Sequence, residues 1–190
     1  FIPPMTFKGC TALKEVILPD TLVYKTAAQR VDGVPVYDGV NGVTGNNYFI
    51  GTSAFGGCTS LESISFPVAR LEYGRPGTQW IGSRAFAGSG LKTLTLPNFI
   101  SCLGKNAFSE CLSLESVILP TVFEWYQPQG ERYGKYRGNT ERVHFLSENV
   151  FGNCPKLKMV DFGGAVTVVV PNAFAGSNVP VRDLLYRSNF

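Results

Sequence analysis

The sequence lacks the features that mark several large classes of protein. No apolar run approaches the ~20 residues that a membrane-spanning helix needs, so no membrane insertion by this segment is expected. The 17 basic and 14 acidic residues nearly balance at a net charge of +3, which disfavours a nucleic-acid partner. With 44% hydrophobic and 16% charged residues, the chain has the composition of a folded domain and not of a disordered one.

The chain opens with FIPPMTF, which contains neither an initiator Met nor the basic n-region of a signal peptide. We therefore expect a fragment or a processed product, in which a lost export signal would leave no trace.

Catalytic and metal-binding patterns are equally scarce. The one histidine, His144, excludes a two-histidine metal site within the chain and has no evident orienting partner, which favours a solvent-edge strand residue. The five cysteines include no Cys-x-x-Cys pair; an oxidised Cys10–Cys58 pair stays open, and Cys102 stands apart from the others. Acidic residues show no paired spacing across a cleft. We predict no catalytic residue, no cofactor-binding residue and no metal ligand, and hence no enzyme.

What the chain does contain is a repeat built on phenylalanine. Five residues before each Phe stands an aliphatic residue, and directly before each Phe stands a small or β-branched one. The repeats are centred on Phe7, Phe55, Phe86, Phe108, Phe151 and Phe174.

The first five Phe residues are followed by the same order of residue types, and the copy after Phe174 decays, with Val179 in the Leu position and Arg182 in place of an apolar residue. Three residues on comes a Cys or Ser, then a Leu, then an aliphatic residue, and finally an apolar residue that usually precedes Pro. The Cys or Ser position is Cys10, Cys58, Ser89, Cys111, Cys154 and Ser177. Since Ser replaces Cys in two copies, we interpret this column as small buried side chains and not as a metal or redox site.

These spacings predict alternating turns and short strands. Phe-x-x-Cys-x-x-Leu places three apolar groups on one face of a short helical or 3₁₀ turn. Leu-x-x-Val-x-Leu-Pro alternates with period two and ends in Pro, as a short strand does. The Ile-Gly pair before Ala-Phe indicates a second extended segment. One such unit cannot bury its apolar face alone, so we predict a β-rich solenoid of about six stacked repeats.

Three segments carry the pattern most clearly: TFKGCTALKEVILP, SAFGGCTSLESISFP and NAFSECLSLESVILP. They resemble the BspA-like class of leucine-rich repeats, which is common on surface proteins of bacteria and some protozoa. The resemblance implies a leucine-rich-repeat solenoid, an extracellular or cell-surface location, and adhesive or protein–protein binding without catalysis.

Insertions interrupt the repeat at one recurring place. Successive Phe residues lie 48, 31, 22, 43 and 23 residues apart, so the longer intervals carry extra residues, always after the strand's Pro. The expected insertions are about 20–49, 68–80 and 121–145, within a single domain 1–190 that ends in a C-terminal cap, 175–190. They hold seven of the eight Tyr residues and both Trp residues.

The third insertion is the candidate ligand-binding region, because it interleaves aromatic and basic residues as binding surfaces do. The candidates are Trp125, Tyr126, Arg132, Tyr133, Tyr136 and Arg137. The alternative is a β-hairpin that packs these rings on the flank of the solenoid. A binding module for an unknown host or bacterial surface protein, or for a glycan, is therefore the first hypothesis. A structural spacer within a larger surface protein is the alternative.

Overall fold

The computed structural model describes residues 1–20, 48–67, 79–98, 100–119, 143–146, 148–162, 166–169 and 172–179. These ranges contain ten short strands and no helix. The strands are β1 (Glu15–Ile17), β2 (Tyr48–Ile50), β3 (Ser63–Ser65), β4 (Gln79–Ile81), β5 (Thr93–Thr95), β6 (Ile100–Leu103), β7 (Ser116–Ile118), β8 (Val143–Leu146), β9 (Met159–Asp161) and β10 (Val166–Val169).

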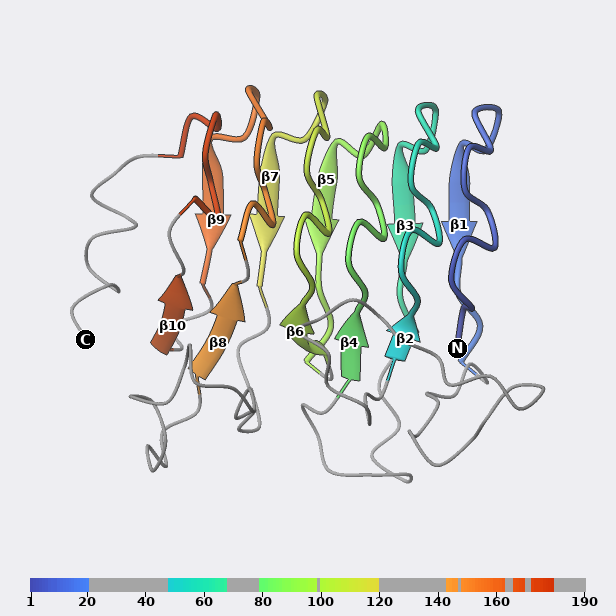
Figure 1. Ribbon diagram of the computed structural model, residues 1–190, viewed down its shortest axis with the longest axis horizontal. Coiled ribbons are helices and arrows are strands. Elements are labelled where there is room, and N and C mark those ends of the chain that lie inside the picture. Colours follow the sequence, from blue (N-terminus) through green and yellow to red (C-terminus); the bar gives the residue numbers. More distant parts are fainter. Residues whose placement is uncertain are drawn as a thin grey trace.

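The strands form two walls of a solenoid (Figure 1). The even-numbered strands make one parallel sheet in the order β10-β8-β6-β4-β2. The odd-numbered strands pair in parallel as β1-β3 and as β5-β7-β9. A backbone hydrogen bond of 3.3 Å from Lys92 to Glu62 continues the second wall between β3 and β5. The four coils around Phe55, Phe86, Phe108 and Phe151 contribute one strand to each wall. The described part of the first coil contributes β1 and an isolated bridge from Ile2 to Ile50, and that of the last contributes β10, so strand order follows chain order along the axis.

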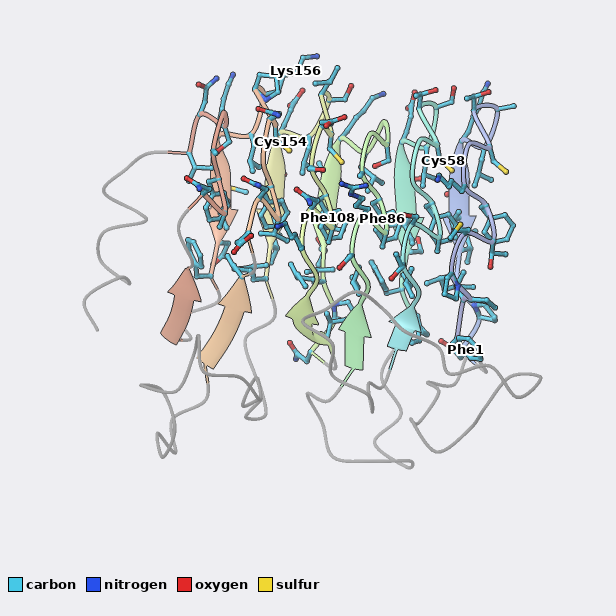
Figure 2. The ribbon with its side chains drawn as sticks, in the orientation of Figure 1. Phe1, Cys58, Phe86, Phe108, Cys154 and Lys156 are labelled. Atoms are coloured by element: carbon cyan, nitrogen blue, oxygen red, sulfur yellow. The ribbon has the colours of Figure 1, made fainter. Side chains whose placement is uncertain are left out.

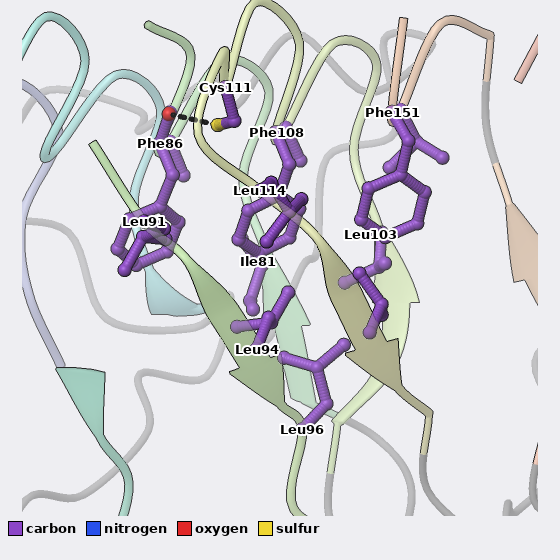
Figure 3. Packing of buried hydrophobic residues seen from close by; sticks show 14 of the residues in the cluster. Ile81, Phe86, Leu91, Leu94, Leu96, Leu103, Phe108, Cys111, Leu114 and Phe151 are labelled. Carbon is purple, nitrogen blue, oxygen red and sulfur yellow. Dashed lines mark hydrogen bonds between the residues drawn. The ribbon is translucent and has the colours of Figure 1, made fainter. Parts of the chain in front are cut away.

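The repeat columns fill the space between the walls, as predicted. The aliphatic residues five before Phe are almost fully buried in Ile50, Ile81, Leu103 and Leu146. Neighbouring Phe rings stack with centroids 5.1 to 5.6 Å apart and interplanar angles of 2° to 14°. Figure 3 shows Phe86, Phe108 and Phe151 following one another through this core. The core is therefore a set of one-residue columns that run along the solenoid axis.

The sequence predicts either a helical or a 3₁₀ turn around each Phe. The described turns contain no helix, so the helical form is wrong for them. They have 3₁₀-type hydrogen bonds, such as Cys58 N–H to the Phe55 carbonyl at 3.2 Å. The backbone adopts positive φ two residues before and two after every Phe, which interrupts a right-handed helix each time. These positions are Met5, Gly9, Ser53, Gly57, Arg84, Gly88, Asn106, Glu110, Asn149, Asn153, Asn172 and Gly176.

A glycine before the turn lets successive coils approach closely. Gly51, Gly82 and Gly104 stand four residues before their Phe, and each N–H donates to a carbonyl of the preceding coil at 2.8 Å. A Cβ atom on any of them would lie 2.5 to 2.6 Å from a backbone nitrogen of that coil. The position therefore requires glycine in these three coils because neighbouring backbone occupies the side-chain direction.

The predicted insertion ranges reach into the even-numbered wall. Strands β2, β4 and β8 begin at Tyr48, Gln79 and Val143, inside the ranges 20–49, 68–80 and 121–145. The closing residues of each range are thus scaffold strands. Residues 21–47, 68–78 and 120–142 lie outside the described residues, as do residues 180–190 of the expected cap.

Candidate functional site

The three insertions join the solenoid along a single edge. Each leaves after an odd-numbered strand, at Asp20, Pro67 or Leu119, and returns at the first residue of an even-numbered strand. Figure 1 shows the even-numbered strands all beginning along this edge. Because strands in one wall are ~4.8 Å apart, the departure points after β1, β3 and β7 span only about 15 Å. The scaffold thus brings the ends of all three insertions close together.

The even-numbered strands that follow the insertions align in rows of backbone positions. Parallel pairing places Tyr48 beside Trp80, Trp80 beside Cys102, and Cys102 beside Phe145. The adjacent row is Ile50, Ile81, Leu103 and Leu146, whose side chains fill the core. Cys102 therefore lies in strand β6 of the even wall, outside the column of the other cysteines.

The six candidate residues predicted from the sequence all lie outside the described residues. These are Trp125, Tyr126, Arg132, Tyr133, Tyr136 and Arg137. The described chain stops at Leu119 before this insertion and resumes at Val143 after it. The fold therefore fixes where the segment joins the scaffold.

His144 occupies an interior strand of the even wall. It lies in β8, which pairs with β6 on one side and with β10 on the other, where Thr167 is its register partner. The predicted strand at His144 is confirmed. The predicted edge position is wrong, because β8 has a paired strand on each side.

The outer face of the odd-numbered wall has the predicted composition. Its two outward rows are exposed or half-buried and consist mainly of small hydroxyl residues, with apolar residues toward the ends. The rows are Glu15, Ser63, Thr93, Ser116 and Met159, and Ile17, Ser65, Thr95, Ile118 and Asp161. No Trp, Tyr or Arg lies in either row, so this face lacks the residues that dominate protein interfaces.

Beside these rows runs a line of alternating charge that the repeat analysis missed. The residue directly after the repeat's Leu is basic in one coil and acidic in the next, and its side chain is exposed in all five coils. These residues are Lys14, Glu62, Lys92, Glu115 and Lys158. Lys92 and Glu62 form an ion pair at 2.7 Å. That hydrogen bond, with the charges of Lys92 and Lys14, lowers the pKa of Glu62. Comparing aligned copies for charge as well as hydrophobicity would have found this line.

The cysteine column serves the packing of the turns. Cys58, Cys111 and Cys154 donate their thiols to the Phe carbonyl of an earlier coil at 3.0, 3.3 and 3.2 Å. Figure 3 shows this bond between Cys111 and Phe86. Ser89 occupies the same column, and its hydroxyl lies 3.3 Å from the Cys111 sulfur. The column thus supplies a short hydrogen-bonding side chain between coils, which Cys and Ser both provide.

The environment of Cys58 and Cys154 disfavours the reactive thiolate, whereas hydrogen bonds with Cys154 and Ser89 lower the pKa of the buried Cys111 thiol. Burial raises the pKa of Cys58. The interaction with Cys111, followed by burial, raises the pKa of Cys154 well above the ordinary range. A nucleophilic or metal-bound cysteine needs the opposite shift. Figure 2 shows Cys58 and Cys154 within the stack, whereas Lys156 points outward from the turn beside it. The arrangement is therefore that of structural side chains.

No group of three His, Cys, Asp or Glu residues suited to a metal ion occurs in the part of the chain that the structure describes. Within the same residues, no helix has the length and apolar character needed to cross a membrane.

Two parallel walls joined by stacked Phe turns define a leucine-rich-repeat solenoid. Residues 50–180 match the BspA type leucine rich repeat region, in six copies. The chain belongs to this family, although the match leaves out the coil around Phe7.

A leucine-rich repeat protein from Bacteroides ovatus ATCC 8483 is similar to this chain at 18% sequence identity and a TM-score of 0.40. The match covers 91% of this chain and 48% of that one, so the chain spans about half the length of that protein. No curated protein matches the chain.

Proposed function

We propose that this chain is a non-catalytic, surface-exposed binding module that recognises a protein partner through its aromatic-rich insertions. The observation that carries the proposal is the convergence of the three insertions: their junctions share one edge of the solenoid within about 15 Å. Segments that join a rigid scaffold so close together can contribute to one binding surface.

The composition of the insertions supports recognition as their role. The repeats use Phe, which fills the dry core, whereas the insertions concentrate Tyr and Trp, whose polar groups suit contact surfaces. In the third insertion, Arg132 and Arg137 accompany Trp125 and Tyr133. Membership of the BspA-type family adds the expectation of a bacterial cell surface and of adhesion to a host or bacterial protein.

The test is a binding screen of the purified chain against host matrix proteins and glycans. A second protein replaces residues 125–137 by a short Gly/Ser turn. We expect a signal on one protein ligand that the replacement abolishes while the thermal midpoint stays unchanged. The matched control is Tyr24→Ala/Tyr37→Ala, which removes two rings from the first insertion and leaves the third intact. A signal that survives in the replaced variant would contradict the assignment to the third insertion.

Two other functions are separable by the same screen. A carbohydrate-binding module would give its signal on a glycan, with exposed Tyr and Trp rings as stacking platforms. A structural spacer would give no signal from either folded protein, and Trp125 would be protected from solvent in fluorescence quenching. The absence of a paired-carboxylate, nucleophile or metal pattern gives an enzyme no comparable support.

A further inference from the structure

The cysteine column arranges its members in adjacent pairs. From the first coil to the sixth, the column reads Cys, Cys, Ser, Cys, Cys and Ser. Cys10 and Cys58 therefore belong to neighbouring coils, as do Cys111 and Cys154, and Ser89 separates the two pairs. Each cysteine of the column has one cysteine neighbour, so the four divide into two pairs with none left over.

Backbone hydrogen bonds hold both pairs in register. Directly before the first pair, the Gly9 N–H donates to the Gly56 carbonyl of the next coil at 2.8 Å. Directly before the second pair, the Glu110 N–H donates to the Gly152 carbonyl at 2.8 Å. The Phe rings three residues before the cysteines stack with centroids 5.2 and 5.6 Å apart. This coil spacing lies within the Cα separation of about 4.4–6.8 Å that a disulfide spans.

The later thiol of each pair reaches toward the coil of the earlier cysteine. Cys58 donates at 3.0 Å to the Phe7 carbonyl, which also accepts the backbone N–H of Cys10 at 3.0 Å. Cys154 makes the equivalent contact with the Phe108 carbonyl at 3.2 Å. The structure holds all four cysteines of the column as free thiols. Each later sulfur thus already lies beside the turn that carries its partner.

The column permits only these two pairings. Ser89 Oγ lies 3.3 Å from Cys111 Sγ, so the side chains of adjacent coils come into contact there. Cys58 and Cys111 are two coils apart, roughly 10 Å by the strand spacing, which exceeds the reach of a disulfide. Of the three ways to pair four cysteines, the stack therefore allows one. Cys102 lies in β6, outside the column.

The two pairs join the coils that the longest insertions separate. The intervals from Cys10 to Cys58 and from Cys111 to Cys154 are 48 and 43 residues. Coils without an insertion follow one another after 22 or 23 residues. A longer interval gives the unfolded chain more conformations, so a cross-link across it removes more entropy from the unfolded state. The cysteine pairs thus stand at the two coil junctions where a cross-link stabilises the stack most.

We propose that Cys10 with Cys58, and Cys111 with Cys154, form two disulfides that clamp the coils on either side of the first and third insertions. These bonds are structural cross-links and not a catalytic redox centre. They hold the scaffold and do not depend on the binding role proposed for the insertions. Because Cys58, Cys111 and Cys154 are buried in the finished stack, the oxidation takes place during folding, while the coils assemble.

The oxidant is a small-molecule disulfide of the glutathione class. One cysteine thiolate attacks a sulfur of the oxidant, whose S–S bond breaks and releases one small thiolate. The second cysteine loses its proton and attacks the first cysteine's sulfur, which forms the protein disulfide and releases the second small thiolate. Two electrons pass from each cysteine pair to one oxidant molecule, and the two thiol protons are taken up by the released thiolates.

The test is a disulfide map of the full chain, refolded from the reduced state in oxidised and reduced glutathione. A second sample is exported to a bacterial periplasm, so that the map does not depend on refolding in vitro. Remaining thiols are alkylated, and linked peptides are identified by mass spectrometry. We expect links from Cys10 to Cys58 and from Cys111 to Cys154, with Cys102 alkylated. Any other pairing, or five alkylated cysteines in the folded chain, would overturn the proposal.

Thermal midpoints of the oxidised and the reduced chain measure the clamping itself. We expect the oxidised chain to melt at least about 5 °C higher. Cys154→Ser should show about half of this difference, and in reductant its midpoint should match that of the parent, because the hydroxyl replaces the thiol's hydrogen bond. The matched control, Cys102→Ser, should keep both links and the full difference. Equal midpoints of the oxidised and reduced parent would contradict the clamping role.

The links are also measured in the protein whose residues 125–137 are replaced by a Gly/Ser turn. This protein retains all four cysteines of the column, so it should form the same two disulfides even where it binds no ligand. Loss of the Cys111–Cys154 link in this protein, while it stays folded, would show that the pairing depends on the insertion and not on the stack. The result therefore distinguishes the cross-links from the proposed function.

Discussion

The first coil and the interior coils carry nearly the same residues in different surroundings. Phe55, Phe86, Phe108 and Phe151 have a coil on each side and are fully buried, whereas Phe7 has a described coil on one side and is 37% exposed. Cys10 is likewise exposed, and Cys58 is buried. The comparison teaches that the repeat motif does not bury its own apolar groups, and that burial comes from the neighbouring coils.

The largest expected difference concerns the Phe column. Phe108→Ala should destabilise the chain by about 3–5 kcal/mol, because it leaves a cavity between two stacked rings. Phe7→Ala should cost only about 1–2 kcal/mol, because part of that ring already contacts water. Urea denaturation followed by circular dichroism measures both. A loss below about 1 kcal/mol for Phe108→Ala would mean that the ring column does not hold the solenoid together.

Glycine substitutions sharpen the comparison at the level of the backbone. Gly82→Ala places a Cβ atom 2.6 Å from the Thr52 nitrogen of the preceding coil and should cost about 1–3 kcal/mol. In the first coil, Gly9 has positive φ but no atom within 4 Å of an added Cβ. Gly9→Asn should therefore change stability by less than about 0.5 kcal/mol, since Asn tolerates this conformation and Asn153 occupies the equivalent position. Equal losses in thermal unfolding would count against close coil approach as the reason for Gly82.

A smaller effect is expected in the cysteine column. Cys154→Ala removes the thiol that donates to the Phe108 carbonyl and should cost about 1–2 kcal/mol. Cys154→Ser should retain most of the stability, because Ser89 and Ser177 occupy the same column. Cys10→Ala, at the exposed end, should be nearly neutral. Denaturation midpoints of the three variants give this order, and a Ser variant as unstable as the Ala variant would refute the hydrogen-bonding role.

The smallest expected effect concerns the exposed charged line. The pKa of Glu62 is lowered first by its hydrogen bond from Lys92, so the ionised pair favours folding above the ordinary carboxyl pKa. This contribution disappears as the pH falls through the lowered pKa. Lys92→Ala should move the Glu62 titration midpoint upward in NMR, and Lys14→Ala should move it less. An equal shift in both variants would show that general charge, and not the direct pair, sets the pKa.

The repeat made the scaffold predictable from sequence alone. Six aligned copies identify the buried Phe, Cys and Leu columns and the outward rows, because stacking gives each position an equivalent neighbour. The turns were harder. Spacing alone allows a helix, and only the φ pattern, with residues as unlike as Met5, Arg84 and Glu110 in left-handed positions, excludes one in the described turns.

The candidate site could not be derived in the same way. Trp125, Tyr133 and Arg137 each occur once, so no second copy indicates what they contact. The sequence could predict where the insertions attach, because that depends on the repeat. It could not predict how their side chains are arranged, and these six candidates remain a prediction.

The shared edge at which the three insertions join has a consequence for the history of such a protein. Hydrogen bonds between coils run through the strands and the Phe turns, and the edge between the two walls lies between those bonded segments. The connection between β5 and β6, residues 96–99, is short, and others exceed twenty residues, yet the coils on both sides keep parallel pairing. Loops at this edge can therefore be lengthened, shortened or exchanged between related genes while the architecture is inherited unchanged.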